Sequence, residues 1–359
     1  MSERGEKKYS PDSRERGAVA VLVAVLMLFL IGMIAMAVDV GYLYATRSEL
    51  QNAADAAALA GARQLGAIYE GMSYEEQVAY DCGECGQIIA AATEFTNQAG
   101  GIPIQIADVT LGRWVNKDFS PTTMQPDAVR VVAVRAEGGI NAPLTTFFAG
   151  LFGKSTFNVG AEAVAALTAQ STVGAGELEI PVGIPTYFFD YHKEAGLTFC
   201  DENIKMYPAN DPTGCAGWHV FDEKNANKPT LEKIIDGANP EIPNVTYESP
   251  AIDIGTSPEF AFSGGNVTAV WDNLYALFEA KKDPNTGSWE TLLAVYESAD
   301  CSNPNRSKPI VGFATVIIDK VLVTPEKTIQ GLVKCDNVEF GRGSGGEYGT
   351  KGSIPGLVR

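Results

Sequence analysis

Two of the six cysteines are spaced as in a redox motif, with Cys82 and Cys85 enclosing only two residues. Such a C-x-x-C pair can act as a thiol–disulfide centre, supply half of a zinc site, or form a plain structural disulfide. A thioredoxin-like centre needs a strand before the motif, whereas Tyr74–Tyr80 has a helical pattern. The acidic surroundings also disfavour a reactive thiolate. We therefore predict a structural disulfide, with redox activity and metal binding as less favoured alternatives.

The other cysteines are Cys200, Cys215, Cys301 and Cys335, and all six follow the long apolar segment near the N-terminus. An even number of cysteines in an oxidising compartment favours disulfides, although spacing alone leaves the connectivity open. We favour pairs that flank a turn-rich stretch or lie within one predicted domain. These pairs are Cys82–Cys85, Cys200–Cys215 and Cys301–Cys335.

Other residues suited to acid–base or metal chemistry are few, since the chain has only two histidines, His192 and His219. Asp190 is placed to orient His192 as a base, but a structural histidine is the favoured interpretation. The proximity of His219 to Cys215 is weak evidence for zinc, which would need two more ligands. No G-x-S-x-G motif is present, and Gly349–Gly352 lacks the ending of a phosphate-binding loop. We predict no catalytic, cofactor-binding or metal-binding residue, no cofactor and no enzymatic activity.

The segment that must position the rest of the chain is a long apolar run near the N-terminus. Ala18–Val38 contains no charged residue, and Asp39 ends it. As a helix rising about 1.5 Å per residue, this run is long enough for a hydrocarbon core about 30 Å thick. A cleaved secretory signal is the alternative, but its apolar core is usually about 7–15 residues. We therefore predict an uncleaved transmembrane helix that ends at Ala18 and Val38.

Charge predicts the orientation of this helix. Residues 1–17 carry Arg4, Lys7, Lys8, Arg14 and Arg16, whereas the twenty residues after Val38 carry only Arg47. Basic residues stay on the cytoplasmic side, so residues 1–17 are predicted to be cytoplasmic and everything after Asp39 to be exported. The net charge of −17 excludes nucleic acid as a partner, because such a surface repels phosphates.

Residues 39–67 predict a continuation of the same helix beyond the membrane. Alanine dominates this stretch and proline is absent, so nothing breaks the helix. Small residues recur on one face and would let another helix approach closely. This face packs either on the protein's own globular part or on neighbouring subunits, including further copies of the chain. The helix-packing candidates are Ala54, Ala57, Ala58 and Gly61.

The remaining sequence predicts an α+β fold in two parts. Residues 68–170 predict a small α+β domain with helices over Ser73–Asn97 and Asn141–Leu151, and strands over Ile102–Val115, Asp127–Arg135 and Thr156–Leu167. The polar stretch Gln170–Glu177 marks a boundary. Residues 171–359 predict a β-rich, disulfide-containing domain with strands over Ile180–Phe189, Ile310–Ile318 and Thr328–Val333, helices over Leu231–Asp236 and Val270–Ala280, and a closing loop at Gly341–Gly356.

Three N-terminal segments carry a family resemblance. They are Arg16–Val21, Val38–Tyr44 with its D-x-G-x-x-Y pattern, and Leu50–Ala62, which reads L-Q-N-A-A-D-A-A-A-L-A-G-A. Together they resemble the TadG-like proteins of bacterial Flp (tight adherence, Tad) pilus systems. Residues 128–134, 145–153 and 159–165 are similar to the next segment of that family, so the resemblance covers about residues 16–168.

The resemblance implies a non-enzymatic component of pilus assembly or envelope anchoring that contributes to surface adhesion. It implies a bacterial inner-membrane protein with a periplasmic C-terminus, and other Tad/Flp pilus-assembly or pilin-like proteins as partners. The alternatives are an exposed minor pilin or adhesin at the cell surface and, less favoured, a periplasmic redox protein. Gly17 is the candidate processing site, but Leu22 stands where pilins of these systems carry glutamate, which argues against a major pilin. No D-x-S-x-S metal motif of a von Willebrand A-type domain is present.

Overall fold

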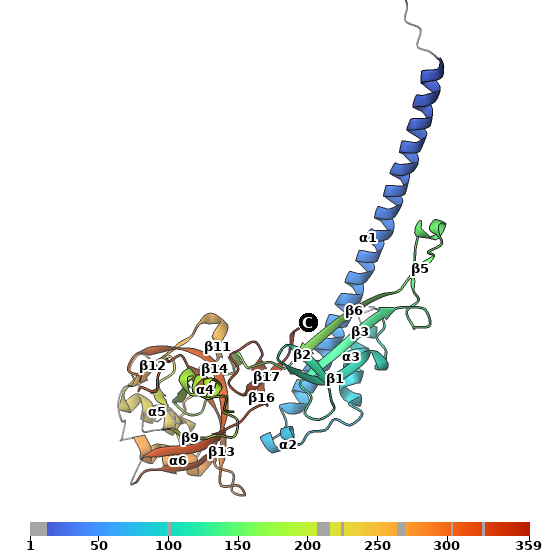
Figure 1. Cartoon of the computed structure of the whole chain (residues 1–359). Coiled ribbons are helices and arrows are strands. Elements are labelled where there is room, and N and C mark those ends of the chain that lie inside the picture. Colours follow the sequence, from blue (N-terminus) through green and yellow to red (C-terminus); the bar gives the residue numbers. More distant parts are fainter. Residues whose placement is uncertain are drawn as a thin grey trace, which may run out of the picture.

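The computed structural model describes residues 13–98, 102–206, 216–223, 226–263, 270–302, 304–324 and 327–359. Its dominant element is one uninterrupted helix, α1 (Ser13–Tyr69), which projects from the globular part of the molecule (Figure 1). The predicted continuation of the apolar helix through residues 39–67 is therefore confirmed. The helix contains no proline and is rich in alanine, so every turn retains its backbone hydrogen bonds.

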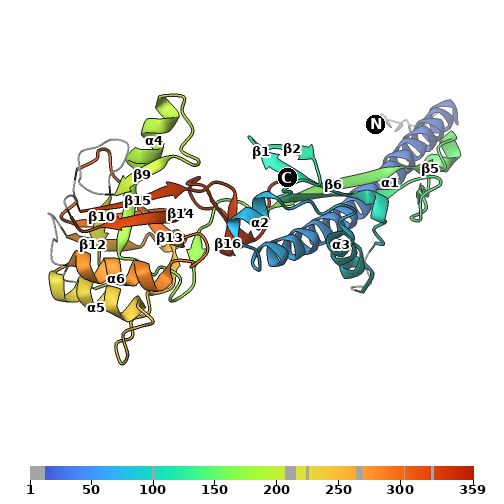
Figure 2. The same ribbon diagram turned by 90° about the horizontal axis from the view of Figure 1, so that it is seen from below.

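The second half of α1 packs on a five-stranded antiparallel sheet with the order β18-β6-β3-β1-β2. Helix α3 (Gly86–Gln98) lies against α1 beside this sheet (Figure 2). Small and medium apolar residues fill the space between helices and sheet. The strands are β1 (Val109–Val115), β2 (Asp118–Pro121), β3 (Ala128–Arg135), β6 (Val159–Ala166) and β18 (Gly356–Leu357).

The predictions for this part are partly confirmed. Strands appear at Asp127–Arg135 and Thr156–Leu167, the latter as β5 (Thr156–Phe157) and β6. The strand predicted at Ile102–Val115 begins only at Val109, after the 3-10 turn η1 (Ile106–Asp108). The helix predicted at Ser73–Asn97 is split into α2 (Tyr74–Val78) and α3.

The helix predicted at Asn141–Leu151 is wrong. The chain instead forms β4 (Leu144–Thr145) and the 3-10 turn η2 (Ala149–Phe152), and β4 pairs with β5. Proline and glycine are poor helix formers, and Pro143 and Gly150 interrupt this segment. We call Leu144–Phe157 the β4–β5 hairpin.

A seven-stranded sheet forms the second core, with the order β12-β10-β8-β13-β14-β15-β9. Its neighbouring strands are antiparallel except β8 and β13. Helices α5 (Lys228–Ala238) and α6 (Trp271–Lys281) lie on one side of the sheet and α4 (Thr186–Glu194) on the other (Figure 2). The strands are β8 (Val182–Pro185), β9 (Asn203–Met206), β10 (Gly217–His219), β12 (Glu259–Ser263), β13 (Trp289–Tyr296), β14 (Ser307–Leu322) and β15 (Thr328–Val333).

Most elements predicted beyond residue 171 are present, and the α+β class is confirmed. Strands occur at Ile310–Ile318 and Thr328–Val333, and helices α5 and α6 include the predicted helical segments, except for Val270. The strand predicted at Ile180–Phe189 stops at Pro185, where α4 begins.

The closing loop predicted at Gly341–Gly356 is wrong. This segment contains part of β16 (Asn337–Arg342), all of β17 (Thr350–Ile354) and the start of β18. β16 and β17 pair in parallel, and β18 joins the first sheet beside β6. The end of the chain therefore returns to the sheet that supports α1. A small further pairing joins β7 (Thr172–Val173) to β11 (Ile252–Asp253), which η3 (Ile254–Thr256) follows.

Candidate functional site

The first half of α1 exposes its apolar side chains on nearly every side. Val21 and Phe29 are each 66% exposed, and Met36 is 70% exposed. By length and composition this helix is the candidate membrane span among the described residues, and little of its most apolar window is covered by the rest of the protein. The predicted processing site Gly17 and the predicted span ends Ala18 and Val38 all lie within α1.

The helix-packing candidates in the second half of α1 contact the protein itself. Ala54, Ala57 and Ala58 are fully buried in the first core. Gly61 is also buried, and a Cβ added there would lie 3.1 Å from Val129 Cγ1 and 3.3 Å from Ala92 Cβ. These small residues let α3 and the sheet approach α1 closely, as the first of the two predicted alternatives requires.

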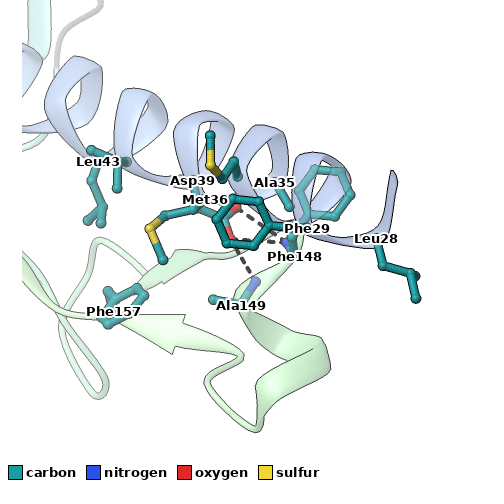
Figure 3. A pocket seen from close by; sticks show the side chains of 12 residues that line it. Leu28, Phe29, Ala35, Met36, Asp39, Leu43, Phe148, Ala149 and Phe157 are labelled. Carbon is teal, nitrogen blue, oxygen red and sulfur yellow. Dashed lines mark hydrogen bonds between the residues drawn. The ribbon is translucent and has the colours of Figure 1, made fainter. Parts of the chain in front are cut away.

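Asp39, the residue that ends the apolar run, binds the β4–β5 hairpin. Its carboxylate accepts backbone hydrogen bonds from Phe147 (2.8 Å), Phe148 (3.1 Å) and Ala149 (2.6 Å). Only 7% of Asp39 is exposed. Figure 3 shows both carboxylate oxygens pointing at the start of η2. One carboxylate thus satisfies three amide groups that η2 cannot pair within itself.

An apolar groove of about 540 Å³ separates the hairpin from α1 (Figure 3). One wall belongs to the hairpin and the other to consecutive turns of α1 on both sides of Asp39. The lining residues include Phe148, Ala149 and Phe157 from the hairpin, and Leu28, Phe29, Met33, Met36 and Leu43 from α1. No sequence pattern predicted this site, whose only local signal was a carboxylate at the end of an apolar run.

The disulfides correct two predicted pairings. Cys82 is bonded to Cys85, as predicted, but Cys200 is bonded to Cys335. The predicted pairs Cys200–Cys215 and Cys301–Cys335 are therefore wrong. Cys200 precedes β9 and Cys335 follows β15, and these strands pair with Asn203 opposite Leu332, which brings the two cysteines together. Cys301 is also disulfide-bonded, and Cys215 lies outside the described residues.

The histidines occupy structural positions. His219 is fully buried among the rings of Phe221, Phe260 and Phe262, and burial lowers its pKa to about 3. The ring of His219 is therefore neutral at physiological pH. The Nδ1 atom of His192 lies 2.7 Å from the carbonyl oxygen of Phe188, in the preceding turn of α4. Among the described residues, no group of three or more His, Cys, Asp or Glu side chains is arranged to hold a metal ion.

Buried polar contacts join the first sheet and α2 to the returning end of the chain. The amide of Gln77 accepts from Val338 N (2.8 Å) and donates to Val338 O (3.1 Å). Lys351 bridges Asp127 (2.7 Å) and Asp336 (2.5 Å), and Asp336 also pairs with Arg113. These paired groups fix the second core against the base of α1, because leaving a buried polar partner unpaired is costly.

A pair of carboxylates lies in the same junction. Burial raises the pKa of Glu339 to about 7, and the neighbouring charge of Glu290 contributes. Burial also raises the pKa of Glu290. The Asn337 amide donates to both, at 2.8 Å to Glu339 Oε1 and 3.3 Å to Glu290 Oε1. At this junction, burial therefore brings the pKa of Glu339 close to neutral.

Comparison with known families identifies the N-terminal part of the chain. Residues 17–64 match a family model described as "Putative Flp pilus-assembly TadE/G-like". The match covers most of α1, including Asp39 and the buried alanines, and confirms the resemblance predicted for this region. No significant match was found among curated proteins or among solved structures.

Proposed function

We propose, on the basis of the TadE/G-like domain at residues 17–64, that this chain is a non-enzymatic, membrane-anchored component of Flp/Tad pilus assembly. The observation that carries the proposal is that one helix contains both the family match and an exposed apolar span. An uninterrupted helix couples the anchor to the globular part, so a force or contact on either end is transmitted to the other.

The proposed location is the bacterial inner membrane. The basic residues before Ala18 support a cytoplasmic N-terminus, and the disulfides support an oxidising compartment, the periplasm, for the rest. We propose domains at residues 68–170 and 171–359, with the last strand returning to the first domain. The proposed partners are other pilus-assembly or pilin-like proteins in the membrane, and the role is assembly or envelope anchoring in support of surface adhesion.

Deleting the gene in its native host tests the assembly role. We expect loss of surface pili and of adhesion, restored by the wild-type gene. Restoration should fail with Leu26→Arg, because a charge near the centre of the span costs about 3 kcal/mol on insertion. Leu26→Ile is the matched control. Normal piliation in the deletion strain would contradict the proposal.

A minor pilin or surface adhesin is the second candidate, because the second core lies at the opposite end of α1 from the anchor (Figure 1). Fractionation distinguishes the two roles. An assembly component remains with membranes after pili are sheared off, whereas a minor pilin appears in the sheared fraction. N-terminal sequencing adds a direct observation, since a mature chain that begins at Ala18 would show cleavage after Gly17 and favour the pilin-like role.

A redox function predicts a different outcome. The double variant Cys82→Ser/Cys85→Ser should retain piliation and lose only stability if the Cys82–Cys85 disulfide is structural. Loss of piliation by a variant that accumulates to normal levels would favour the redox alternative.

A further inference from the structure

We propose that the β4–β5 hairpin (Leu144–Phe157) inserts into the lipid leaflet nearest the globular part, and that lipid acyl chains occupy the groove between it and α1. The hairpin would then be a second membrane contact, separate from the spanning helix. The proposal rests on the membrane anchor of the proposed function and is independent of the role in pilus assembly.

The groove extends along α1 into the apolar run. Its α1 wall reaches from Leu43 back to Leu28, which lies well inside the apolar run. The run Ala18–Val38 measures about 31 Å as a helix, so a hydrocarbon core of about 30 Å requires all of it. The part of the groove lined by Leu28–Met36 must therefore lie within the bilayer. Phe148 and Phe157 line the same groove and are brought to the membrane surface with it.

The hairpin has the composition of a segment that contacts lipid. The chain has 44 acidic residues, yet none lies between Glu137 and Glu162. Phe147 is 66% exposed and Phe148 is 37% exposed, as expected of side chains that face lipid rather than water. Lys154 is the one charged residue of the hairpin. Its ammonium can extend to the phosphate groups of the lipids while the apolar stem lies deeper.

Aromatic residues on α1 mark the same depth. Tyr42 and Tyr44 are 37% and 72% exposed, and they follow Asp39 by about one turn. Tyr42 contacts the ring of Phe147 at 5.5 Å between centroids. Tyrosine is enriched where hydrocarbon meets headgroups, because its ring is apolar and its hydroxyl is polar. The interface therefore passes at the level of these tyrosines, and the groove extends from there toward the hydrocarbon.

Several backbone groups of the hairpin are hydrogen-bonded within the protein, as a segment in lipid requires. The amides of Phe147, Phe148 and Ala149 bond to Asp39. The Thr146 amide donates to the carbonyl oxygen of Ser155 (3.1 Å). The Thr146 hydroxyl donates to the carbonyl oxygen of Lys154 (2.7 Å). The turn itself is closed by bonds from Gly153 N to Gly150 O and from Lys154 N to Ala149 O, both 3.1 Å. The hairpin can thus leave water without abandoning these hydrogen bonds.

Lipid is favoured over a protein occupant because large apolar side chains are exposed along the whole span, and the groove opens onto them. Acyl chains are the solvent of that face, and they fill an irregular apolar groove without a matching surface. A transmembrane helix of a second copy is the alternative occupant, and it would shield the hairpin from both lipid and water.

Depth-dependent fluorescence quenching tests the insertion. Full-length Phe147→Trp is reconstituted into phosphatidylcholine vesicles containing lipids brominated along the acyl chain, with the wild-type signal subtracted to remove the native tryptophans. Leu197→Trp, at a position that is 55% exposed in the second core, is the control outside the membrane. We expect brominated lipid to quench Phe147→Trp at least about twofold more strongly than Leu197→Trp, because only lipid-immersed rings meet bromine.

Val25→Trp reports on the anchor itself. Quenching of Val25→Trp without quenching of Phe147→Trp would overturn hairpin insertion alone, whereas no quenching of either would also remove the membrane anchor from the proposed function. Acrylamide, a water-soluble quencher, completes the test. An unquenched Phe147→Trp that acrylamide reaches would place the hairpin in water. One that acrylamide does not reach would overturn the lipid assignment in favour of a second copy of the chain.

Discussion

The two halves of α1 differ in side-chain size and in what surrounds them. Before Asp39 the helix carries large side chains that stay exposed, such as Phe29 and Met36. After Asp39 it carries alanines such as Ala57 and Ala58, which are fully buried. Lipid accommodates any side-chain shape, so large residues are favoured there. A sheet and a helix that approach closely leave room only for small ones.

Glycines in the two halves show the same difference. A Cβ at Gly32 would meet nothing within 4 Å, whereas a Cβ at Gly66 would collide with the backbone of Ser353 in β17. Around Gly66, the second half of α1 is therefore held by contacts that tolerate no added atom, whereas the surroundings of Gly32 in the first half are open. The same type of substitution, placed in each half, tests whether this difference in packing holds.

The largest effect is expected from Gly66→Ala compared with Gly32→Ala. In the first half, alanine improves helix propensity by up to about 1 kcal/mol and contacts nothing. At Gly66 the added methyl collides with backbone that cannot move aside, so we expect a loss of about 3 kcal/mol in unfolding free energy. Chemical denaturation of the full chain in detergent, followed by tryptophan fluorescence, measures the unfolding free energy of both variants. Equal effects would mean that α1 does not pack on the returning strand.

Local sequence signals were sufficient for elements whose stability is local. Alanine content and the absence of proline predicted α1, and alternation predicted β3. The Gly341–Gly356 segment failed because its strands depend on distant partners. A Cβ at Gly345 would collide with the backbone of Gln170, and one at Gly352 with that of Arg342. Glycine serves there for close backbone approach, which from sequence alone looks the same as a loop.

The candidate site was less predictable than the fold for the same reason. Asp39 was identified only as the end of the span, because its hydrogen-bond partners are more than a hundred positions away. The Cys200–Cys335 pairing likewise depends on β9 lying beside β15. Neither contact leaves a pattern in a short window of sequence. The alanines named from the sequence are buried, and their contact with the chain's own sheet was one of two predicted alternatives.

The second effect concerns side-chain volume. Ala58→Leu adds three carbons to a fully buried position, and we expect a loss of about 1–3 kcal/mol in unfolding free energy. Ala37→Leu makes the same change at an exposed position of the first half and should leave that free energy within about 0.5 kcal/mol of wild type. Differential scanning calorimetry in detergent checks the pair. A destabilised Ala37→Leu would show that the first half also packs on protein.

A smaller effect on the unfolding free energy should depend on pH, and it should arise only beside the second half of α1. No titratable residue lies between Ala18 and Val38, whereas the second half rests on β16 and β17, near Glu339. Burial raises the pKa of Glu339 from an ordinary 4.5 to about 7, so the folded protein binds this proton more tightly than the unfolded chain. The stabilisation is complete below about pH 4.5 and is lost as pH rises through 7.

Glu339→Gln removes this titration while keeping an oxygen that can accept from Asn337. We expect the variant to gain about 1 kcal/mol over wild type at pH 8 and little at pH 5. Denaturant titrations at a series of pH values measure the difference. An identical pH profile for the two proteins would show that Glu339 has an ordinary pKa in the folded state.

The smallest effect on overall stability, and the most local, is expected at the boundary between the halves. Asp39→Ala removes the acceptor of three backbone amides in the β4–β5 hairpin but leaves the core around the buried alanines untouched. Hydrogen exchange of residues 147–149 should accelerate about tenfold or more, because a local opening replaces a paired state. Asp39→Asn retains one oxygen acceptor, so its exchange rate at residues 147–149 should lie between those of wild type and Asp39→Ala. Amides around Ala54 and Ala57 should exchange as in wild type. If they also accelerate, Asp39 stabilises the whole helix, and the two halves of α1 are not energetically separate.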